Sequence, residues 1–213
     1  MNKATMLSVT RILAVVVTAT LSLNALGETR PAATGRAAPQ LSQSYVWYDG
    51  NRQQTVWLNP QLVAEFNPSP QGATATRSAD ANAKMLPVKH SQGGVRLWQM
   101  NNTGDVAVRG LVVSHPTGKY SPVFHDAPTS SGAMRALPGN IIVYLNPTWD
   151  AATVSNWIKT HKLEVVKKLE IGPNIYVIKT APGLDALTTA NALYLSGEVS
   201  AAFPDWWQEV TTR

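Results

Sequence analysis

The chain has 213 residues, with 18 lysines and arginines against 13 aspartates and glutamates, and a formal net charge of +5. It contains no cysteine, which excludes disulfide bonds, thiolate metal sites and thiol catalysis. Hydrophobic residues make up 44% and charged residues 15% of the chain, a balance typical of a globular protein and too polar for a multi-span membrane protein. The length suits one large domain or two small ones.

The first 27 residues have the features of a secretory signal peptide. Lys3 and Arg11 give a positive start, an apolar run follows over residues 12–23, and Ala25 and Gly27 are small residues two positions apart. The run is shorter than the roughly 20 residues of a spanning helix, which makes an uncleaved membrane anchor the weaker alternative. We therefore expect cleavage after Gly27, with cleavage after Ala25 as the weaker alternative. We also expect a periplasmic or secreted protein with no stable membrane association after cleavage.

The region that follows the signal is predicted to be mostly β-structure. Residues 28–44 are rich in Ala, Pro, Gly and Thr and predict a flexible leader. Aromatic and β-branched runs at 45–48 and 55–58 flank the turn sequence at 49–51 and predict a β-hairpin. Further strands are predicted at residues 62–66, 95–99 and 106–113. We therefore expect a β-rich region over residues 45–113.

Two stretches of this half of the chain show no strand or helix pattern. Residues 71–84 are dominated by Ala, Thr, Ser, Asn and Asp and predict a loop. Residues 114–139 are interrupted by four prolines and predict an irregular connection. Because this connection is long, we expect the β-rich region to form a lobe separate from the C-terminal part.

The C-terminal third predicts a complete small domain over residues 140–205. Strand patterns alternate with two helical patterns in the order β-α-β-β-α-β, with strands at 140–146, 163–169, 175–179 and 199–203 and helices at 148–159 and 185–195. Thr148 or Asp150 can cap the first helix, and Ser196 and Gly197 can end the second. This order predicts an α+β, ferredoxin-like antiparallel sheet with both helices on one face.

This domain resembles the propeptide domain of subtilisin-like serine proteases. The segments that carry the resemblance are 141–147, 163–169, 174–178, 185–187 and 197–205. Upstream, the segments 45–50, 58–66 and 121–124 resemble the extended pro-regions of bacterial kexin-like members. The chain departs from the family because only eight residues follow Asp205 and no serine lies in a nucleophile motif of that family. The resemblance implies a stand-alone, external chaperone and inhibitor of a secreted subtilisin-like or kexin-like protease.

The resemblance also implies where the partner binds. The C-terminal tail, residues 206–213, would lie in the active-site cleft of the protease as an added strand. The expected partner-binding residues are Trp206, Trp207, Gln208, Glu209, Val210, Thr211, Thr212 and Arg213. We expect the two tryptophans to be exposed and Arg213 to fill an acidic pocket, with its carboxylate near the nucleophile. The alternatives are a tryptophan that packs on the protein's own core and a terminal Arg213 without a role.

The remaining polar residues give no catalytic, metal or cofactor site. His115, His125 and Asp126 lie in the proline-rich stretch and are interpreted as solvated, and His161 complements the dipole of the first helix. Removal of the signal lowers the net charge to +3, and the lysine cluster is interpreted as a solvated strand edge, so nucleic acid is not an expected partner. The cluster comprises Lys159, Lys162, Lys167 and Lys168.

Two other functions stay open for this sequence. An acylphosphatase-like hydrolase on the same fold would need an arginine in the loop after the first strand of the domain, and residues 147–150 provide none. A non-functional remnant of a longer protease precursor would have the same sequence features as a working chaperone. We therefore expect a protein that is not an enzyme and binds no cofactor.

Overall fold

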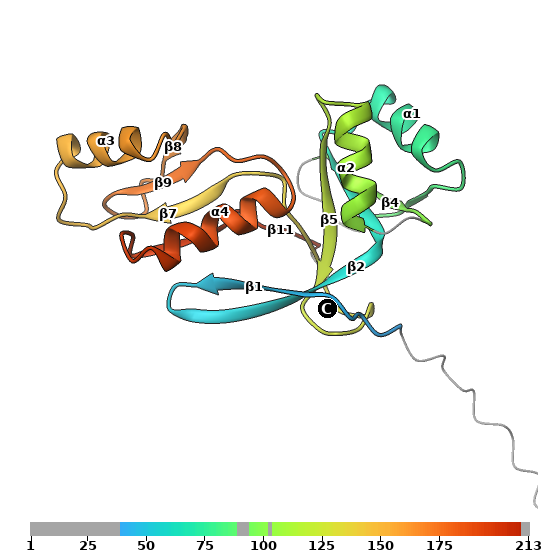
Figure 1. Ribbon diagram of the computed structural model, residues 1–213, viewed down its shortest axis with the longest axis horizontal. Helices are drawn as coiled ribbons and strands as arrows, with labels where there is room; N and C mark the ends of the chain where they lie inside the picture. Colours follow the sequence, from blue (N-terminus) through green and yellow to red (C-terminus); the bar gives the residue numbers. More distant parts are fainter. Residues whose placement is uncertain (1–38, 89–93, 102–103, 210–213) are drawn as a thin grey trace, which may run out of the picture. The chain divides into compact units, whose positions relative to one another are not determined.

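The computed structural model describes residues 39–88, 94–101 and 104–209, all of which belong to one compact unit. These residues form two antiparallel sheets and four helices, which confirms the α+β class (Figure 1). None of the described helices is long and apolar enough to cross a bilayer. The predicted signal peptide lies outside the described residues.

The C-terminal third forms a four-stranded antiparallel sheet with strand order β10-β7-β9-β8. Its elements follow one another as β7 (Ile141–Tyr144), α3 (Ala151–Thr160), β8 (Val165–Lys168), β9 (Ile175–Ile178), α4 (Leu184–Leu195) and β10 (Ala201–Pro204). The predicted order of strands and helices is therefore confirmed, with bounds within three residues of those expected.

Local interactions set the ends of the two helices of this region. A side-chain oxygen of Asp150 accepts a hydrogen bond of 2.7 Å from the backbone N–H of Thr153, so Asp150 rather than Thr148 caps α3. His161 ends this helix, and its Nδ1 lies 2.9 Å from the carbonyl oxygen of Trp157, as expected for a residue at a helix C-terminus. Helix α4 is followed by Gly197, whose φ of +73° is the left-handed conformation that glycine adopts without strain.

Both helices of this region pack on the same apolar core. Within the four-stranded sheet, Ile141 lies opposite Ile178 and Val143 lies opposite Ala202, so these four side chains share one face. They meet the buried sides of α3 and α4 in a cluster that we call the shared core. Its buried members are Val56, Leu58, Phe124, Leu137, Ile141, Val143, Leu145, Val154, Trp157, Ile178, Ala186, Leu187, Ala190, Val199 and Ala202.

The chain before the four-stranded region, together with one strand from the C-terminal tail, forms a seven-stranded antiparallel sheet. Six strands follow the order β11-β6-β5-β2-β4-β3, and β1 pairs with the beginning of β2. The strands are β1 (Ser44–Asp49), β2 (Arg52–Phe66), β3 (Lys84–Leu86), β4 (Val95–Gln99), β5 (Lys119–His125), β6 (Met134–Ala136) and β11 (Trp207–Gln208). The predicted hairpin and the predicted strand at residues 95–99 are confirmed, and residues 62–66 form the end of β2.

Two predictions for this region are wrong because helices replace a loop and a strand. Residues 71–84, predicted as a loop, contain helix α1 (Pro70–Ala79), which begins where Ser69 Oγ accepts a 2.9 Å hydrogen bond from the Gly72 N–H. Residues 106–113, predicted as a strand, belong to helix α2 (Gly104–Ser114). Its buried residues Ala107, Val108 and Leu111 have helical spacing, which outweighs the β-propensity of its valines.

The proline-rich stretch is also more regular than predicted. Residues 114–139, expected to be irregular, include β5 in the middle of the sheet and β6 beside it. Pro122 is tolerated within β5 because the register with β2 shifts next to it, between Asn59 and Val63. The end of the predicted flexible leader is ordered as well, since Leu41 is buried and its N–H donates to the carbonyl oxygen of Pro128 at 3.0 Å.

The expectation of a separate N-terminal lobe is wrong. Val56, Leu58 and Phe124 come from the seven-stranded sheet but belong to the shared core, together with residues of α3 and α4. The Nδ2 of Asn191 on α4 donates a 2.8 Å hydrogen bond to the carbonyl oxygen of Val46 on β1. The two sheets are distinct in their hydrogen bonding, yet they bury apolar side chains against each other.

Candidate interaction surface

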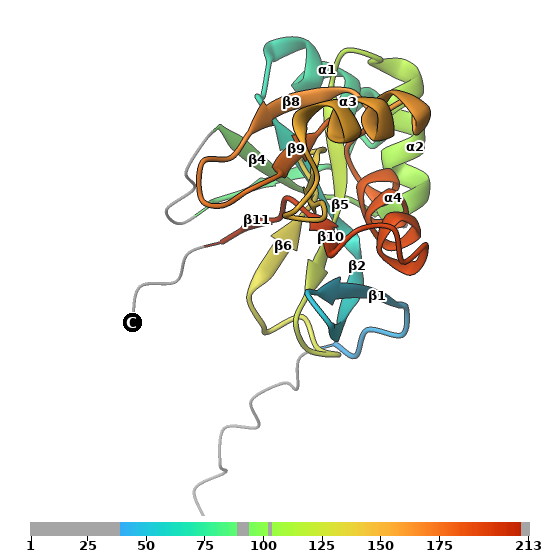
Figure 2. The ribbon, with the colours of Figure 1, turned by 90° about the vertical axis from the view of Figure 1, so that its left-hand side faces the viewer.

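The described part of the C-terminal tail lies on the protein's own seven-stranded sheet. Strand β11 pairs with β6, with Trp207 opposite Ala136 and Gln208 opposite Arg135 (Figure 2). Trp207 is only 8% exposed, and its ring lies 6.5 Å from that of Phe66 in an edge-to-face arrangement. The tail therefore extends the sheet as an edge strand.

The neighbouring tryptophan is held by aromatic contacts. The ring of Trp206 lies 5.6 Å from that of Trp47 and 5.7 Å from that of Phe124, both edge-to-face. Trp206 therefore has aromatic partners on β1 and β5, and Trp207 has one on β2. The expectation that these two tryptophans are exposed is wrong. Of the expected binding residues, Gln208 is exposed, Glu209 is half-buried, and Val210, Thr211, Thr212 and Arg213 lie outside the described residues.

A second surface lies on the face of the four-stranded sheet that is opposite the shared core. Side chains alternate along each strand, so Ile142 and Tyr144 of β7 point away from the helices, as does Phe203 opposite Ile142. These three residues are half-buried and belong to none of the clusters found among the described residues. The Tyr144 and Phe203 rings lie 5.7 Å apart. We call this apolar patch the outer face.

Charged residues lie at the rim of the outer face. Lys167 of β8 is opposite Val177 and therefore shares this face, and Asp205 follows the last residue of β10. Burial raises the pKa of Asp205 above its ordinary value, and the positive charge of Lys167 opposes that rise. All four residues of β8 are exposed, and β8 is an end strand of the four-stranded sheet in the described part of the chain. The lysine cluster is solvated, as predicted.

The predicted binding residues include none of the outer face, although the sequence holds a signal for it. Strand β7 reads Ile-Ile-Val-Tyr, so both of its faces are apolar, whereas a sheet with one solvated face has alternating polar residues. Buried and half-buried residues alternate along β7, so only the side chains on one face of this strand lie in the shared core. An apolar surface of this kind, rimmed by charges, is typical of a docking site for another protein.

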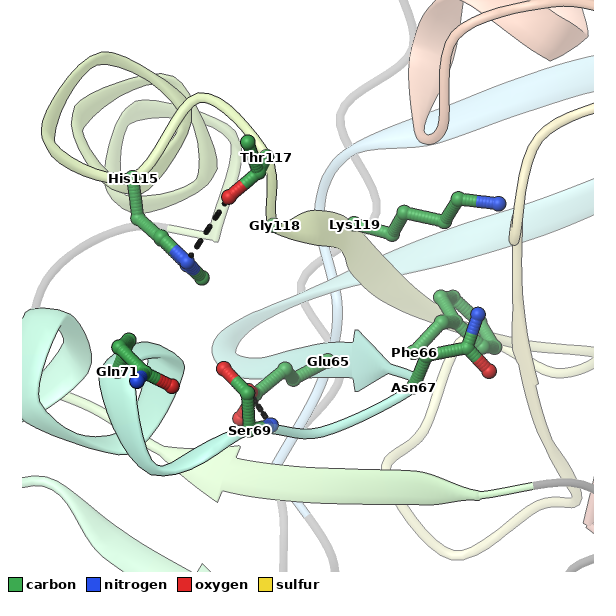
Figure 3. A pocket seen from close by; sticks show the side chains of 9 residues that line it. All are labelled: Glu65, Phe66, Asn67, Ser69, Gln71, His115, Thr117, Gly118 and Lys119. Carbon is green, nitrogen blue, oxygen red and sulfur yellow. Dashed lines mark hydrogen bonds between the residues drawn. The ribbon is translucent and has the colours of Figure 1, made fainter.

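A polar pocket beside α1 brings together residue types that can act in catalysis. Figure 3 shows Glu65, Ser69, Gln71, His115 and Thr117 around it, and its volume is about 310 Å³. His115 Nδ1 lies 2.8 Å from the hydroxyl oxygen of Tyr120, and its Nε2 lies 3.2 Å from Thr117 Oγ1. His115 is thus bonded within the protein rather than solvated as predicted.

The acidic group of this pocket has a structural role. Glu65 is 2% exposed, and its carboxylate accepts hydrogen bonds from Trp98 Nε1 at 2.9 Å, from Arg96 at 3.2 Å and from the Ser69 N–H at 3.2 Å. Burial, followed by the charge of Glu65, raises the pKa of Tyr120 to about 12. The hydrogen-bonded carboxylate therefore fastens α1 to the sheet, and the Tyr120 phenol stays protonated near neutral pH.

The other histidine of the proline-rich stretch is buried, which corrects the expectation of a solvated loop. His125 is 1% exposed; its Nε2 lies 3.1 Å from Asn59 Nδ2 and its Nδ1 lies 3.0 Å from the Gly132 carbonyl oxygen. No group of three His, Asp or Glu side chains suited to a metal ion occurs among the described residues.

No family model, no curated protein and no solved structure matches the chain. The functional interpretation therefore depends on the chain's own geometry. Two features stand out for an interaction with another protein: the outer face of the four-stranded sheet, and the C-terminal segment that continues from β11.

Proposed function

We propose that this protein is a secreted or periplasmic chaperone that assists the folding of a subtilisin-like, kexin-like serine protease and then inhibits it. The support comes from the four-stranded sheet, whose elements follow the β-α-β-β-α-β order that the resemblance to a propeptide domain led us to expect. The observation that carries the proposal is the outer face, an apolar sheet surface left half-exposed opposite two packed helices.

The outer face would form the main contact with the protease. Tyr144 and Phe203 supply large, rigid rings, which concentrate binding energy when a partner covers them. Lys167 and Asp205 at the rim carry opposite charges and would fix the orientation of the partner more than they strengthen its binding. Coverage of this patch would also stabilise the folded chaperone, since binding to the native state shifts its unfolding equilibrium.

The C-terminal segment would form a second contact in the active-site cleft. In the sequence, residues 210–213 come directly after Glu209, whose N–H is hydrogen-bonded to the Met134 carbonyl oxygen beside the edge strand β11. An extended segment can add to a strand in the cleft through its backbone hydrogen bonds. Arg213 would place its guanidinium against carboxylates of an acidic pocket, as expected for a protease that prefers a basic residue before the cleavage point.

Inhibition of a purified bacterial kexin-like protease, measured with a peptide substrate that carries arginine before the cleaved bond, tests the outer face. Tyr144→Glu is expected to weaken inhibition by at least tenfold, because it places a charge within the apolar contact. Val113→Glu is the matched control: Val113 is 81% exposed on α2, far along the chain from the outer face, and its substitution should leave inhibition unchanged.

Co-expression with the protease provides the test of the chaperone role. We expect active protease in the presence of the wild-type chain and a clear loss of active protease with Tyr144→Glu. If Tyr144→Glu unfolds at the wild-type temperature and still inhibits and assists folding as well as the wild type, the outer face is not the docking surface and the proposed function loses its main support.

A further inference from the structure

A groove lies where the connections between the two sheets meet, next to the first residue of β5 and just before β7. Two adjoining hollows, of about 330 Å³ and about 640 Å³, are both lined by Lys119, Pro138 and Asn140, and together we call them the junction groove. Both volumes fall in the range of ligand-binding pockets. The side chain of Lys119 points away from His115 (Figure 3), so its ammonium group is not one of the groups gathered in the polar pocket beside α1.

Buried polar atoms without a hydrogen-bond partner gather at this groove. Within the described residues, four buried side-chain atoms lack a partner: Trp206 Nε1, Trp207 Nε1, Thr180 Oγ1 and Asn191 Oδ1. Three of them belong to residues that line the groove, the two tryptophans in the smaller hollow and Thr180 in the larger. Buried polar groups are almost always hydrogen-bonded in folded proteins, and an indole N–H can only donate. Three exceptions at one place therefore point to a ligand that supplies acceptors.

Tight backbone packing sets the shape of the groove. Gly139 has a φ of +96°, which glycine adopts without strain, and a Cβ at this position would lie 2.9 Å from the carbonyl oxygen of Thr180. Asn140 is also left-handed, with a φ of +72°, and its carbonyl oxygen accepts a hydrogen bond of 3.3 Å from the Asp205 N–H. The connection before β7 thus contacts both other walls of the groove, so a ligand meets a site that is already formed.

The charges of the groove are compensated within the protein except at Lys119. In the larger hollow, Glu164 forms an ion pair of 2.8 Å with Lys179. In the smaller hollow, Asp205 lies in the field of the positive charge of Lys167. Lys119 is exposed and forms no ion pair with another described residue. The groove therefore offers one positive charge beside its unpaired donors, which favours an acidic ligand.

We propose that the junction groove binds an extended, acidic segment of the protease, with a carboxylate on Lys119 and carbonyl oxygens on the unpaired donors that line it. An extended segment suits the groove because its main chain offers a carbonyl oxygen at every residue, and Pro138 and Val166 add apolar walls. Asp205 lines the groove and also lies at the rim of the outer face, so a protein that covers the outer face reaches the groove. The identity of the partner rests on the proposed function, whereas the chemistry of the groove does not.

Binding of a short acidic peptide tests this chemistry without the protease. The probe is the peptide Val-Glu-Val-Glu-Val with both ends blocked, and heteronuclear NMR spectra of the full chain follow the indole N–H signals of its seven tryptophans. The signals of Trp206 and Trp207, assigned with Trp206→Phe and Trp207→Phe, should shift downfield more than the others as their N–H groups become hydrogen-bonded. The same peptide with glutamine in place of glutamate should bind about threefold more weakly, as expected for the loss of an exposed ion pair.

Lys119 is tested against a matched lysine. Lys119→Gln should weaken binding of the acidic peptide about threefold. Lys84→Gln is the control and should leave binding unchanged, because Lys84 is also the exposed first residue of a strand but lies outside the groove. In the protease assay, Lys119→Glu should weaken inhibition about tenfold, and Lys84→Glu should not. The loss should become smaller at high salt, because salt screens the repulsion between exposed charges.

Three results would overturn the inference, and each differs from a failure of the proposed function. If about 10 mM peptide moves neither indole signal, the groove binds no acidic segment. If sodium acetate at the same carboxylate concentration moves both signals as far as the peptide does, the groove binds a free anion and not a segment. If the peptide binds but Lys119→Glu inhibits as well as the wild type, the protease is not the occupant. The proposed function fails separately, when Tyr144→Glu inhibits and assists folding normally, and that outcome leaves the peptide result unchanged.

Discussion

The two sheets of this protein differ in how far apart in the chain their strands lie. The four-stranded sheet uses elements that follow one another from Ile141 to Pro204. The seven-stranded sheet joins strands from Ser44 to Gln208, so its last strand comes from beyond the whole four-stranded sheet. The four-stranded sheet can be predicted from the sequence because its elements are close together in the chain. The seven-stranded sheet depends on pairings between distant segments, which appear only in the folded chain.

The two regions also differ in the chemistry of their interiors. The side chains that α3 and α4 bury against the four-stranded sheet are apolar. The seven-stranded sheet buries Glu65, Ser121 and His125, each with hydrogen-bond partners. A buried charge is costly unless it is paired and hydrogen-bonded, so this polar set fixes one arrangement of strands and helices more strictly than an apolar core does.

The largest expected effect comes from a residue that belongs to both regions. Phe124 is fully buried in β5 of the seven-stranded sheet and is part of the shared core. Phe124→Ala should lower the free energy of unfolding by about 3–5 kcal/mol, through lost burial and the cavity that remains. Urea denaturation measures this loss. Hydrogen exchange should show that amides of β4 and β7 lose protection together.

A variant confined to the seven-stranded sheet serves as the control. Leu97 is fully buried in the cluster with Phe66 and Trp207, away from the shared core. If the two sheets unfold as one unit, Leu97→Ala also lowers the protection of β7. Wild-type protection of β7 in Phe124→Ala would show that the sheets are energetically independent and that their contact is incidental.

A smaller effect distinguishes two helical glycines of the seven-stranded region. A Cβ on Gly72 would lie 2.0 Å from Glu65 Oε1, whereas a Cβ on Gly110 would meet no atom within 4 Å. Gly72→Ala should therefore destabilise the protein by about 1–3 kcal/mol, as overpacked sites do. Gly110→Ala should stabilise it by about 0.5–1 kcal/mol, because alanine favours the helix. Chemical denaturation of both variants compares them directly.

The outcome at Gly72 bears on the buried carboxylate. If Gly72→Ala is as stable as the wild type, α1 can move away from the sheet at little cost, and Glu65 does not fasten it. Glu65→Gln in the same assay distinguishes the contribution of side-chain size to stability from the contribution of charge. The amide fills the same space as the carboxylate but cannot accept hydrogen bonds from all three donors.

The sequence predicted the four-stranded region because its signals are local. Asp150, Ser196 and Gly197 mark helix ends, and apolar residues with helical or alternating spacing lie between them. Helix α2 was misread because its valines favour strands, although Ala107, Val108 and Leu111 carry helical spacing.

Other features could not be predicted because they depend on distant partners. Glu65 is bonded to side chains about 30 residues away, at Arg96 and Trp98, and no local pattern reveals such a pairing. Trp206 and Trp207 were expected to be exposed because they follow the last strand of the domain. Their partners on β1, β2 and β5 become neighbours only when the two sheets meet.

The smallest expected effect compares two aspartates of the four-stranded region through pH. Hydrogen bonds, first from the backbone N–H of Thr153, hold the pKa of Asp150 below 3.8, whereas burial raises the pKa of Asp205 above it. A carboxyl with a lowered pKa stabilises the fold above its unfolded pKa, and this contribution is lost as the pH falls. A carboxyl with a raised pKa binds its proton more tightly in the folded state, so its effect has the opposite sign: stability increases as the pH falls through that pKa.

Asp205→Asn should therefore raise the free energy of unfolding at pH 7 by less than about 1 kcal/mol, since solvent screens a half-exposed group. It should also remove the gain in stability that Asp205 gives on acidification. Asp150→Asn keeps a good helix cap, because asparagine also accepts a hydrogen bond at this position. It should remove only the loss of stability that protonation of Asp150 causes at low pH. Thermal unfolding of both variants between about pH 7 and pH 3 measures how the stability of each changes with pH. Asp205→Asn should lose more stability on acidification than Asp150→Asn, because Asp205→Asn still carries Asp150.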